Sequence, residues 1–311
     1  MAYAQISVDT SGTAAKPILG AANGVAVINI ATPNAAGVSN NRYTAYNVPA
    51  QGVVLNNSPN GATTTLAGTI GGNSQIGAVP ARTILNQVTG TTVTTLAGSQ
   101  EIAGQRANLV VANPNGITVN NQAIRFINAN NVTLAAGNAG INSTGITGYG
   151  IGGGRININT AINAVNNNRL DILARAVTVA ANIRADGHPL NIITGANTIK
   201  ADLSDITPMT PAAHPALALD VKALGGMYAG QINLIATEQG VGVNNAGVIA
   251  LSKSAAGANA SLSMDINGNL TNTKGTISGG GYNSAVFSKF NVTEAGNGNV
   301  DIRSTGDITN T

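Results

Sequence analysis

Residues 167–197, NNRLDILARAVTVAANIRADGHPLNIITGAN, carry the pattern that decides the fold. Short runs of alternating apolar and polar residues are typical of strands with one buried face. The alanines of LARAVTVAAN also suit a helix, but Val177, Thr178 and Val179 favour a strand because branched side chains lose freedom in helices. The stretch therefore predicts short strands joined by Asn and Gly turns, burying Leu170, Ile172, Val177, Val179, Ile183, Leu190 and Ile192.

The same design continues on both sides of this stretch. GRININT, residues 154–160, places Ile156 and Ile158 on one face of a strand and Asn157 and Asn159 on the other. Residues 221–311 repeat short alternating runs that end in Asn or Gly, whereas residues 1–150 mix apolar runs with long polar turns. The proline-rich segment 200–220 interrupts this order and predicts a loop or an excursion from the regular fold.

The composition narrows the choice of architecture. Of the 311 residues, 43% are hydrophobic and only 9% are charged, so the chain is not of the disordered class. Many short strands suit a sandwich, a barrel or a solenoid. Scarce aromatics (3%) suit a narrow stacked interior, and the 42 Asn suit sharp corners and side-chain ladders. Together with the similar units near the carboxyl end, these features favour an all-β, right-handed parallel β-helix.

Several function classes lack support in the residues. The 15 Lys and Arg are scattered, which argues against nucleic-acid binding. The absence of cysteine excludes disulfides and Cys-ligated zinc. His188 and His214 have no second metal-ligating residue nearby in the sequence, so we expect both to be loop residues. We therefore expect no metal and no cofactor. No segment has the length of a membrane span or the pattern of a signal peptide, so the signal of an exported parent is expected to have been removed.

Two further groups of residues could suggest cofactor binding or catalysis, but a structural role is favoured for both. GYGIGG, residues 148–153, formally matches a dinucleotide fingerprint, but a strand-like run follows it, which favours a glycine-rich turn entering a strand. Asp202, Asp205 and Asp220 are the nearest set of carboxylates that a polysaccharide-active enzyme would need. We expect them to be solvated turn residues, although acids distant in sequence converge on stacked coils in some arrangements.

Long blocks of the chain resemble a known family. The blocks include VINIATPNAAGVSNNRYTAYNVPAQGVVLNNS (27–58), LAGSQEIAGQRANLVVANPNGITVNN (96–121), LDILARAVTVAANI (170–183) and ALGGMYAGQINLIATEQGVGVNNAG (223–247). They cover most of residues 20–250 and are similar to the amino-terminal secretion domain of two-partner secretion exoproteins. The last block is particularly similar to the branch of filamentous haemagglutinins and contact-dependent growth inhibition proteins.

The resemblance implies a β-helix with an amino-terminal cap and extra-helical antiparallel strands. It implies a secretion domain over residues 1–250 and the start of a continuous β-helical shaft over residues 251–311. The parent would be a long toxin or adhesin of a Gram-negative bacterium, moved through the periplasm to the cell surface. Its partner would be an outer-membrane transporter whose POTRA domains bind this domain, and the fragment itself would be monomeric, with no enzymatic activity and no small-molecule substrate.

The resemblance also marks two motifs. Asn113, Pro114, Asn115, Gly116 and Ile117 match the family's NPNG-type signature. A related secondary motif comprises Pro33, Asn34, Asn40 and Asn41, with Thr32 in place of the usual Asn and Asn40 in place of a common His. The NPNG signature either contacts the transporter or only shapes the coil, since Pro114 fixes φ and Gly116 permits φ > 0, as a turn requires. Two other functions stay open: an adhesive, carbohydrate-binding shaft and a polysaccharide-active enzyme.

Overall fold

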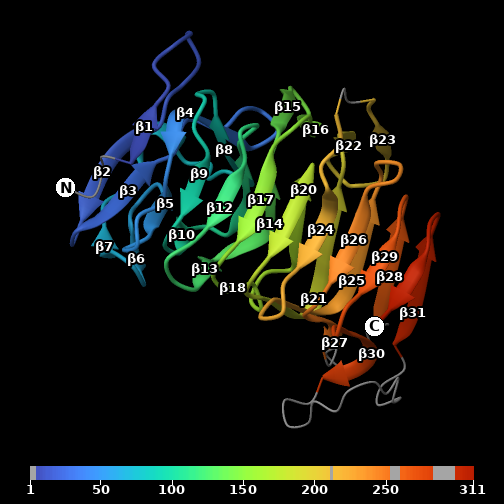
Figure 1. Cartoon of the computed structure of the whole chain (residues 1–311). Helices are drawn as coiled ribbons and strands as arrows, with labels where there is room; N and C mark the ends of the chain where they lie inside the picture. The colour runs from blue at the N-terminus through green and yellow to red at the C-terminus, as the bar shows by residue number, and fades with distance from the viewer. Residues whose placement is uncertain (1–4, 211–212, 253–259, 283–297) are drawn as a thin grey trace.

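The computed structural model describes residues 5–210, 213–252, 260–282 and 298–311. Its strands wind into successive coils that stack into a rod, with the amino terminus at one end and the last coil at the other (Figure 1). Each regular coil contributes one strand to each of three parallel faces. The segment singled out by sequence therefore lies in a parallel β-helix, as predicted.

Face 1 is a continuous stack of parallel strands. It consists of β4 (Val38–Tyr46), β8 (Thr83–Val88), β11 (Ala107–Ala112), β14 (Ala129–Ala135), β19 (Arg169–Ala174), the second half of β21 (Asn182–Thr194), the second half of β25 (Gly226–Ala236), β28 (Ser261–Ile266) and β31 (Asn299–Ser304).

Face 2 begins near the amino terminus and includes the first halves of β21 and β25, so these two long strands span the border of faces 1 and 2. Its other strands are β3 (Val25–Asn29), β5 (Val53–Asn57), β10 (Gln100–Gly104), β13 (Ile124–Ile127), β18 (Ile162–Asn163), β27 (Val248–Ser252) and β30 (Thr276–Tyr282).

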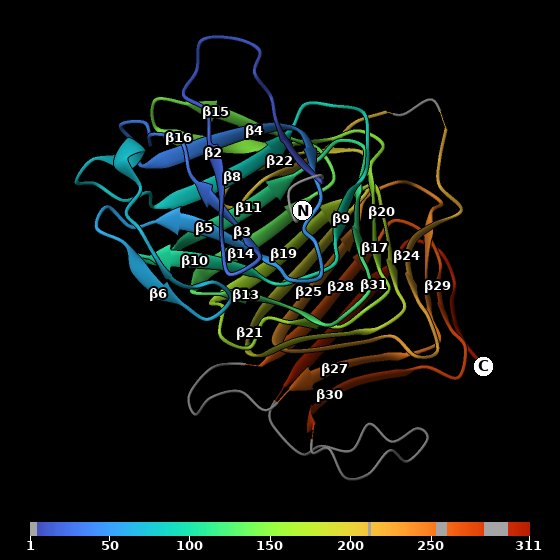
Figure 2. The ribbon, with the colours of Figure 1, turned by 90° about the vertical axis from the view of Figure 1, so that its left-hand side faces the viewer.

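Face 3 is a separate stack of short parallel strands. It consists of β9 (Thr94–Leu96), β12 (Ile117–Val119), β17 (Arg155–Ile158), β20 (Ala176–Val179), β24 (Leu217–Val221), β26 (Gly242–Asn245), β29 (Leu270–Asn272) and β32 (Ile308–Asn310). The three faces enclose the interior (Figure 2).

Strands outside the coils confirm the predicted cap and extra-helical sheet. At the amino-terminal end, β1 (Ile6–Val8) and β2 (Ile18–Ala22) pair antiparallel with β4 and β3. A four-stranded antiparallel sheet, the outer sheet, consists of β15 (Asn138–Asn142), β16 (Gly145–Ile151), β22 (Asn197–Lys200) and β23 (Ile206–Pro208). A hairpin of β6 (Ala62–Thr64) and β7 (Gly68–Ile70) and a 3-10 turn, Ser74–Ile76, complete the described elements.

The interior of the rod is a continuous column of aliphatic side chains. All seven apolar residues predicted to be buried in residues 167–197 lie in it, each at most 2% exposed. Ile156 and Ile158 also point inward, and Asn157 between them is half-buried. Burial of a Val, Leu or Ile side chain contributes about 1.5–3 kcal/mol, so this column is the main stabilising feature of the rod.

A ladder of asparagines runs through the last coils. Asn245 donates its side-chain amide to Oδ1 of Asn272 at 2.7 Å, and Asn272 donates to Oδ1 of Asn310 at 2.9 Å. Stacked amides of this kind satisfy one another's donors and acceptors. The abundance of Asn thus serves coil stacking, as the composition indicated.

Some residues depart from their expected environment. GYGIGG is mostly strand, because β16 includes Gly148–Ile151 and only Gly152 and Gly153 bend before β17. His188 lies within β21, next to a register irregularity, and not in a loop. The excursion predicted over residues 200–220 exists, since β23 belongs to the outer sheet and β24 returns to face 3. No helix in the described part of the chain is long and apolar enough to cross a membrane.

Candidate functional site

The NPNG motif forms the corner between faces 1 and 3. Strand β11 ends at Ala112 and β12 begins at Ile117, so the coil changes direction within four residues. The Gly116 amide donates to the Asn113 carbonyl at 3.0 Å, which closes a β-turn. The Asn115 amide donates to Oδ1 of Asn113 at 2.9 Å, and Pro114 between them supplies a fixed φ.

The two Asn side chains of this corner bind the preceding coil. The Asn113 side chain is fully buried and donates to the Thr92 carbonyl and the Thr94 hydroxyl, both at 2.9 Å. The Asn115 side-chain amide donates to the Gly90 carbonyl at 2.8 Å and to Oδ1 of Asn113 at 2.9 Å. The polar groups of the motif therefore join one coil to the coil before it.

The following coil packs closely against the other side of the corner. The Asn113 amide donates to the Ala135 carbonyl at 2.9 Å. Gly116 has φ +115°, and a Cβ atom at this position would lie 2.6 Å from the Arg155 carbonyl. Only glycine fits both the backbone conformation and the space. Ile117 then turns fully into the interior, which ends the motif as a strand.

The secondary motif forms a turn ahead of β4. Asn34 is exposed, and its Oδ1 accepts the Ala36 and Val38 amides, both at 3.0 Å. Its side-chain amide donates to the Asn142 carbonyl at 3.3 Å, at the tip of the β15–β16 hairpin. Pro33, half-buried beside it, precedes this Asx turn. The motif thus joins the first coils to the outer sheet.

Asn40 and Asn41 lie on opposite sides of β4. Asn41 is fully buried, accepts the Ala31 amide at 2.8 Å and donates to the Leu85 carbonyl at 3.3 Å. Asn40 is half-buried, and its Oδ1 has no hydrogen-bond partner among the described residues. Asn41 therefore has a clear structural role in the first coils.

The two motifs do not form one site. Both motifs bind the same segment, β14–β15, at different ends. The Asn113 amide donates to the Ala135 carbonyl at the end of β14, and the Asn34 side chain donates to the Asn142 carbonyl at the end of β15. In the next coil the chain leaves the rod at the corner that corresponds to NPNG and forms β15 and β16 before it returns as β17. The candidate site is thus a set of corner contacts and not a cavity.

Two buried carboxylates, Glu101 and Glu238, anchor segments that leave the rod. Neither role was predicted from the sequence. Both oxygens of Glu101 accept backbone amides of the β6–β7 turn, those of Thr65 and Leu66, each at 2.7 Å. A buried carboxylate normally requires such partners. The only sequence signal is the rarity of acids in this chain, since nothing near Glu101 specifies its partners.

Glu238 anchors the second such segment, which begins near Ala196 and returns past His214. It accepts Arg175 Nε at 2.8 Å and the Ala196 amide at 2.9 Å, and His214 Nδ1 lies 2.8 Å from its other oxygen. Burial raises the pKa of Glu238, but these hydrogen bonds outweigh burial and leave its pKa below the usual range. His214 therefore has a hydrogen-bond partner, which its sequence neighbourhood did not indicate.

The three acids considered for enzymatic chemistry are not brought together. Asp202 caps its own turn by accepting from Ser204, whereas Asp205 and Asp220 pair with Lys200 and Lys222. Asp202 and Asp205 are turn residues, as predicted, and Asp220 is a half-buried residue of β24. In the described ranges, no three His, Cys, Asp or Glu side chains are grouped as metal ligands would be.

Comparison with known proteins establishes the family. The model of the TPS secretion domain matches residues 4–272 of the chain. The chain belongs to this family. It is 42% identical over 256 residues to Toxin CdiA of Yersinia pestis, which covers 81% of the chain but only 8% of the toxin. It is 40% identical over 228 residues to the 16S rRNA endonuclease CdiA of Enterobacter cloacae, covering 72% of the chain and 7% of that protein.

The fold agrees with this secretion-domain family. A crystal structure of the filamentous hemagglutinin secretion domain superimposes with a TM-score of 0.72 at 26% identity, covering 98% of this chain and 96% of that one. The chain is thus a secretion domain of the exoprotein class that includes CdiA and filamentous hemagglutinin. It spans less than a tenth of the length of these CdiA proteins.

Proposed function

We propose that this secretion domain is recognised in the periplasm by the POTRA domains of a cognate outer-membrane transporter, which then starts translocation of a long exoprotein. The domain itself is a recognition module and not an enzyme. After crossing the outer membrane of a Gram-negative bacterium, it folds as a β-helix at the cell surface. Its membership of the TPS secretion family supports the transporter as the partner.

One structural observation supports recognition before folding. In the folded coil, both side-chain amides of the NPNG motif are hydrogen-bonded within the rod, to Gly90, Thr92, Thr94 and within the corner itself. A transporter that read these amides would have to meet the chain before the corner closed. An extended, unfolded segment suits addition to a sheet edge of the partner, because its backbone groups are still free.

Coil stacking supports folding as the step that retains the chain outside. Each long strand of face 1 pairs along its length with the strand of the next coil, as Ile232 pairs with Leu262 and Leu262 with Val300. Sliding back would require this buried column to unfold, coil by coil. Non-local strand pairing is also slow, which suits a chain that has to remain unfolded until it emerges.

The parent protein is proposed to be a contact-dependent growth inhibition toxin or a related adhesin. The similarity to Toxin CdiA and to the endonuclease CdiA supports this parent class, although the match covers only 7–8% of the length of those proteins. We propose that residues 1–250 are the recognised domain and residues 251–311 the start of the shaft. The unbroken pairing of β25 with β28 and of β28 with β31 supports continuity between them.

A binding experiment tests this proposal. The purified POTRA region of the cognate transporter is immobilised, and the chain is applied either folded or freshly diluted from urea, with a non-cognate POTRA region as the control. We expect saturable binding of the unfolded chain to the cognate region, and at least about tenfold weaker binding of the folded chain. Equal binding to both POTRA regions, or no binding of the unfolded chain, would contradict the proposal.

A further inference from the structure

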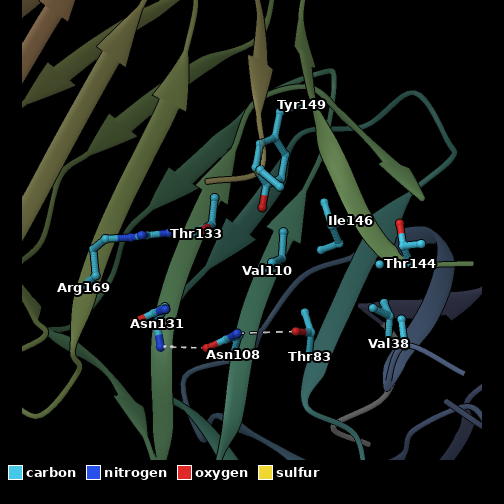
Figure 3. Close-up of a pocket in the computed structure, with 13 residues that line it drawn as sticks. Val38, Thr83, Asn108, Val110, Asn131, Thr133, Thr144, Ile146, Tyr149 and Arg169 are labelled. Atoms are coloured by element: carbon cyan, nitrogen blue, oxygen red, sulfur yellow. Dashed lines mark hydrogen bonds between the residues drawn. The ribbon is translucent and has the colours of Figure 1, made fainter. Parts of the chain in front are cut away.

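A pocket of about 260 Å³ lies between face 1 and the outer sheet, and its lining includes none of the residues of the NPNG motif. Outward-facing residues of successive face 1 strands form its floor, and β16 forms its roof with Ile146 and Tyr149 (Figure 3). Nothing in the secretion role uses this space. Its volume falls just below the roughly 300–1,000 Å³ of pockets for drug-sized ligands, so it suits a smaller molecule.

The floor carries a row of polar side chains from neighbouring strands. Thr83, Asn108, Asn131 and Arg169 come from β8, β11, β14 and β19 and line the pocket. The Asn108 carboxamide lies 3.5 Å from the Thr83 hydroxyl, and its oxygen accepts the Asn131 amide at 3.3 Å. The row therefore offers hydroxyl, carboxamide and guanidinium groups, which include both donors and acceptors.

A buried carboxylate holds part of this lining in place. Asp171 is fully buried beside the floor residues Thr133 and Arg169. It accepts Arg169 Nε at 2.9 Å, the Thr133 hydroxyl at 3.1 Å and the Asn191 side-chain amide at 2.7 Å. Burial raises the pKa of Asp171, against the opposing effect of Arg169. Burying an acid is costly, and a fully hydrogen-bonded network of this kind gives its members one rigid arrangement.

The roof adds a phenolic hydroxyl and apolar side chains. Tyr149 is only 5% exposed, and its hydroxyl points down toward the floor, near Thr133 and Val110 (Figure 3). Burial raises the pKa of the Tyr149 hydroxyl to about 12, so it remains a neutral donor and acceptor at every physiological pH. Ile146 and Val110 supply apolar contacts beside the ring.

We infer that this pocket binds one neutral, polyhydroxylated sugar ring of the pyranose type. An apolar ligand would shield the Asn131 side chain and the other polar groups of the row from water without offering them hydrogen bonds, which costs free energy. An anionic ligand would compete with Asp171, which already neutralises Arg169 at 2.9 Å. A pyranose fits the remaining groups, because its hydroxyls pair with the polar row and with the Tyr149 hydroxyl, and its C–H groups pack on Ile146 and Val110. This use of the pocket rests on the proposed function, which places the folded domain at the cell surface. There the pocket contacts a sugar residue of a glycan.

Solution NMR of the folded chain tests this inference. Methyl spectra are recorded while D-glucose, D-galactose or N-acetyl-D-glucosamine is added. For at least one sugar we expect saturable shifts at the Val38, Val110 and Ile146 methyls, with a Kd on the order of millimolar for about a dozen heavy atoms. Linear shifts with all three sugars, or saturable shifts at other methyls only, would overturn the inference.

Matched variants assign the binding to the pocket. Asn131→Ala removes one hydrogen-bonding side chain and is expected to weaken the sugar about 5- to 10-fold. Thr118→Ala, on the outer surface of face 3, is the control and should leave the Kd unchanged. If Asn131→Ala lowers the melting temperature, Ala201→Trp tests the site by filling the pocket and should abolish the shifts. Unchanged affinity in Ala201→Trp would overturn the inference.

Discussion

Asn115 donates its side-chain amide to the main-chain carbonyl of Gly90, at 2.8 Å and across 25 residues of sequence. The bond joins corners of two successive coils on the same edge of the rod. It makes the signature motif a contact between coils as well as a turn within one. The consequences can be measured separately for folding and for secretion.

Replacing Asn115 with Ala should weaken coil stacking. The change removes the bonds to Gly90 and to Asn113 and leaves the Gly90 carbonyl without this partner, so we expect a loss of about 1–2 kcal/mol in the free energy of unfolding. Urea denaturation measures it. Asn120→Ala is the control, because Asn120 is an exposed residue of the next corner.

The same variant separates the two roles of the motif in cells. Loss of secretion with unchanged stability and folding kinetics would assign Asn115 to transporter contact. Reduced stability together with proportionally reduced secretion would assign Asn115 to shaping the coil through its bonds to Gly90 and Asn113. Full secretion of Asn115→Ala by the cognate transporter would show that the residue is dispensable for both.

Gly116→Ala should be more harmful than Asn115→Ala. Its φ of +115° disfavours an L-residue, and the added Cβ would lie 2.6 Å from the Arg155 carbonyl. Overpacking and backbone strain each cost about 1–3 kcal/mol, so a combined loss of about 3 kcal/mol is expected by urea denaturation. Gly152→Ala meets nothing within 4 Å and should change stability by less than about 0.5 kcal/mol. Similar losses in both variants would contradict this account.

Glu238→Gln should destabilise the excursion that returns through His214. The change breaks a buried pair with Arg175 and is expected to cost about 3 kcal/mol near pH 7. Asp301→Asn, in the exposed pair with Arg303, is the control and should cost less than about 1 kcal/mol.

The Glu238 effect should depend on pH in a defined direction. Because the folded-state pKa lies below the ordinary 4.5, the stabilisation is fully present above about pH 4.5 and is lost as pH falls through the folded pKa. The stability difference between wild type and Glu238→Gln should therefore shrink on acidification below pH 4.5. A difference that grows in acid would contradict the lowered pKa.

Asn272→Ala should loosen the last coils selectively. Asn272 donates to Asn310 and to the Gly275 carbonyl and accepts from Asn245, so the ladder loses its central member. We expect faster hydrogen exchange in β29 and β32, by about tenfold or more, with little change in β11. Uniform acceleration along the rod would show that the ladder does not act locally.

Local alternation was sufficient to predict much of the rod. The seven apolar residues of segment 167–197 and the strand GRININT have the predicted orientation, because side-chain period depends only on neighbouring residues. The corner role of Asn115 and Gly116 also follows from their backbone preferences. These are local properties, which a sequence expresses directly.

The missed features depend on partners far along the chain. GYGIGG forms a strand because β16 pairs with β15 on one side and β22 on the other, with Tyr149 opposite Ala139 and Ile199. Glu238 pairs with Arg175, 63 residues earlier. No local pattern specifies such pairings, and the same holds for the pocket, whose floor collects one or two residues from each of five strands.

The export of a passenger tests the central claim most directly. Residues 1–311, preceded by a signal peptide and followed by an inert reporter, are produced in Gram-negative cells with or without the cognate transporter. The account predicts reporter in the medium or on the cell surface only when the transporter is present. Reporter that stays in the periplasm with the transporter, or escapes equally without it, would contradict the assignment of this chain as a transporter-recognised secretion module.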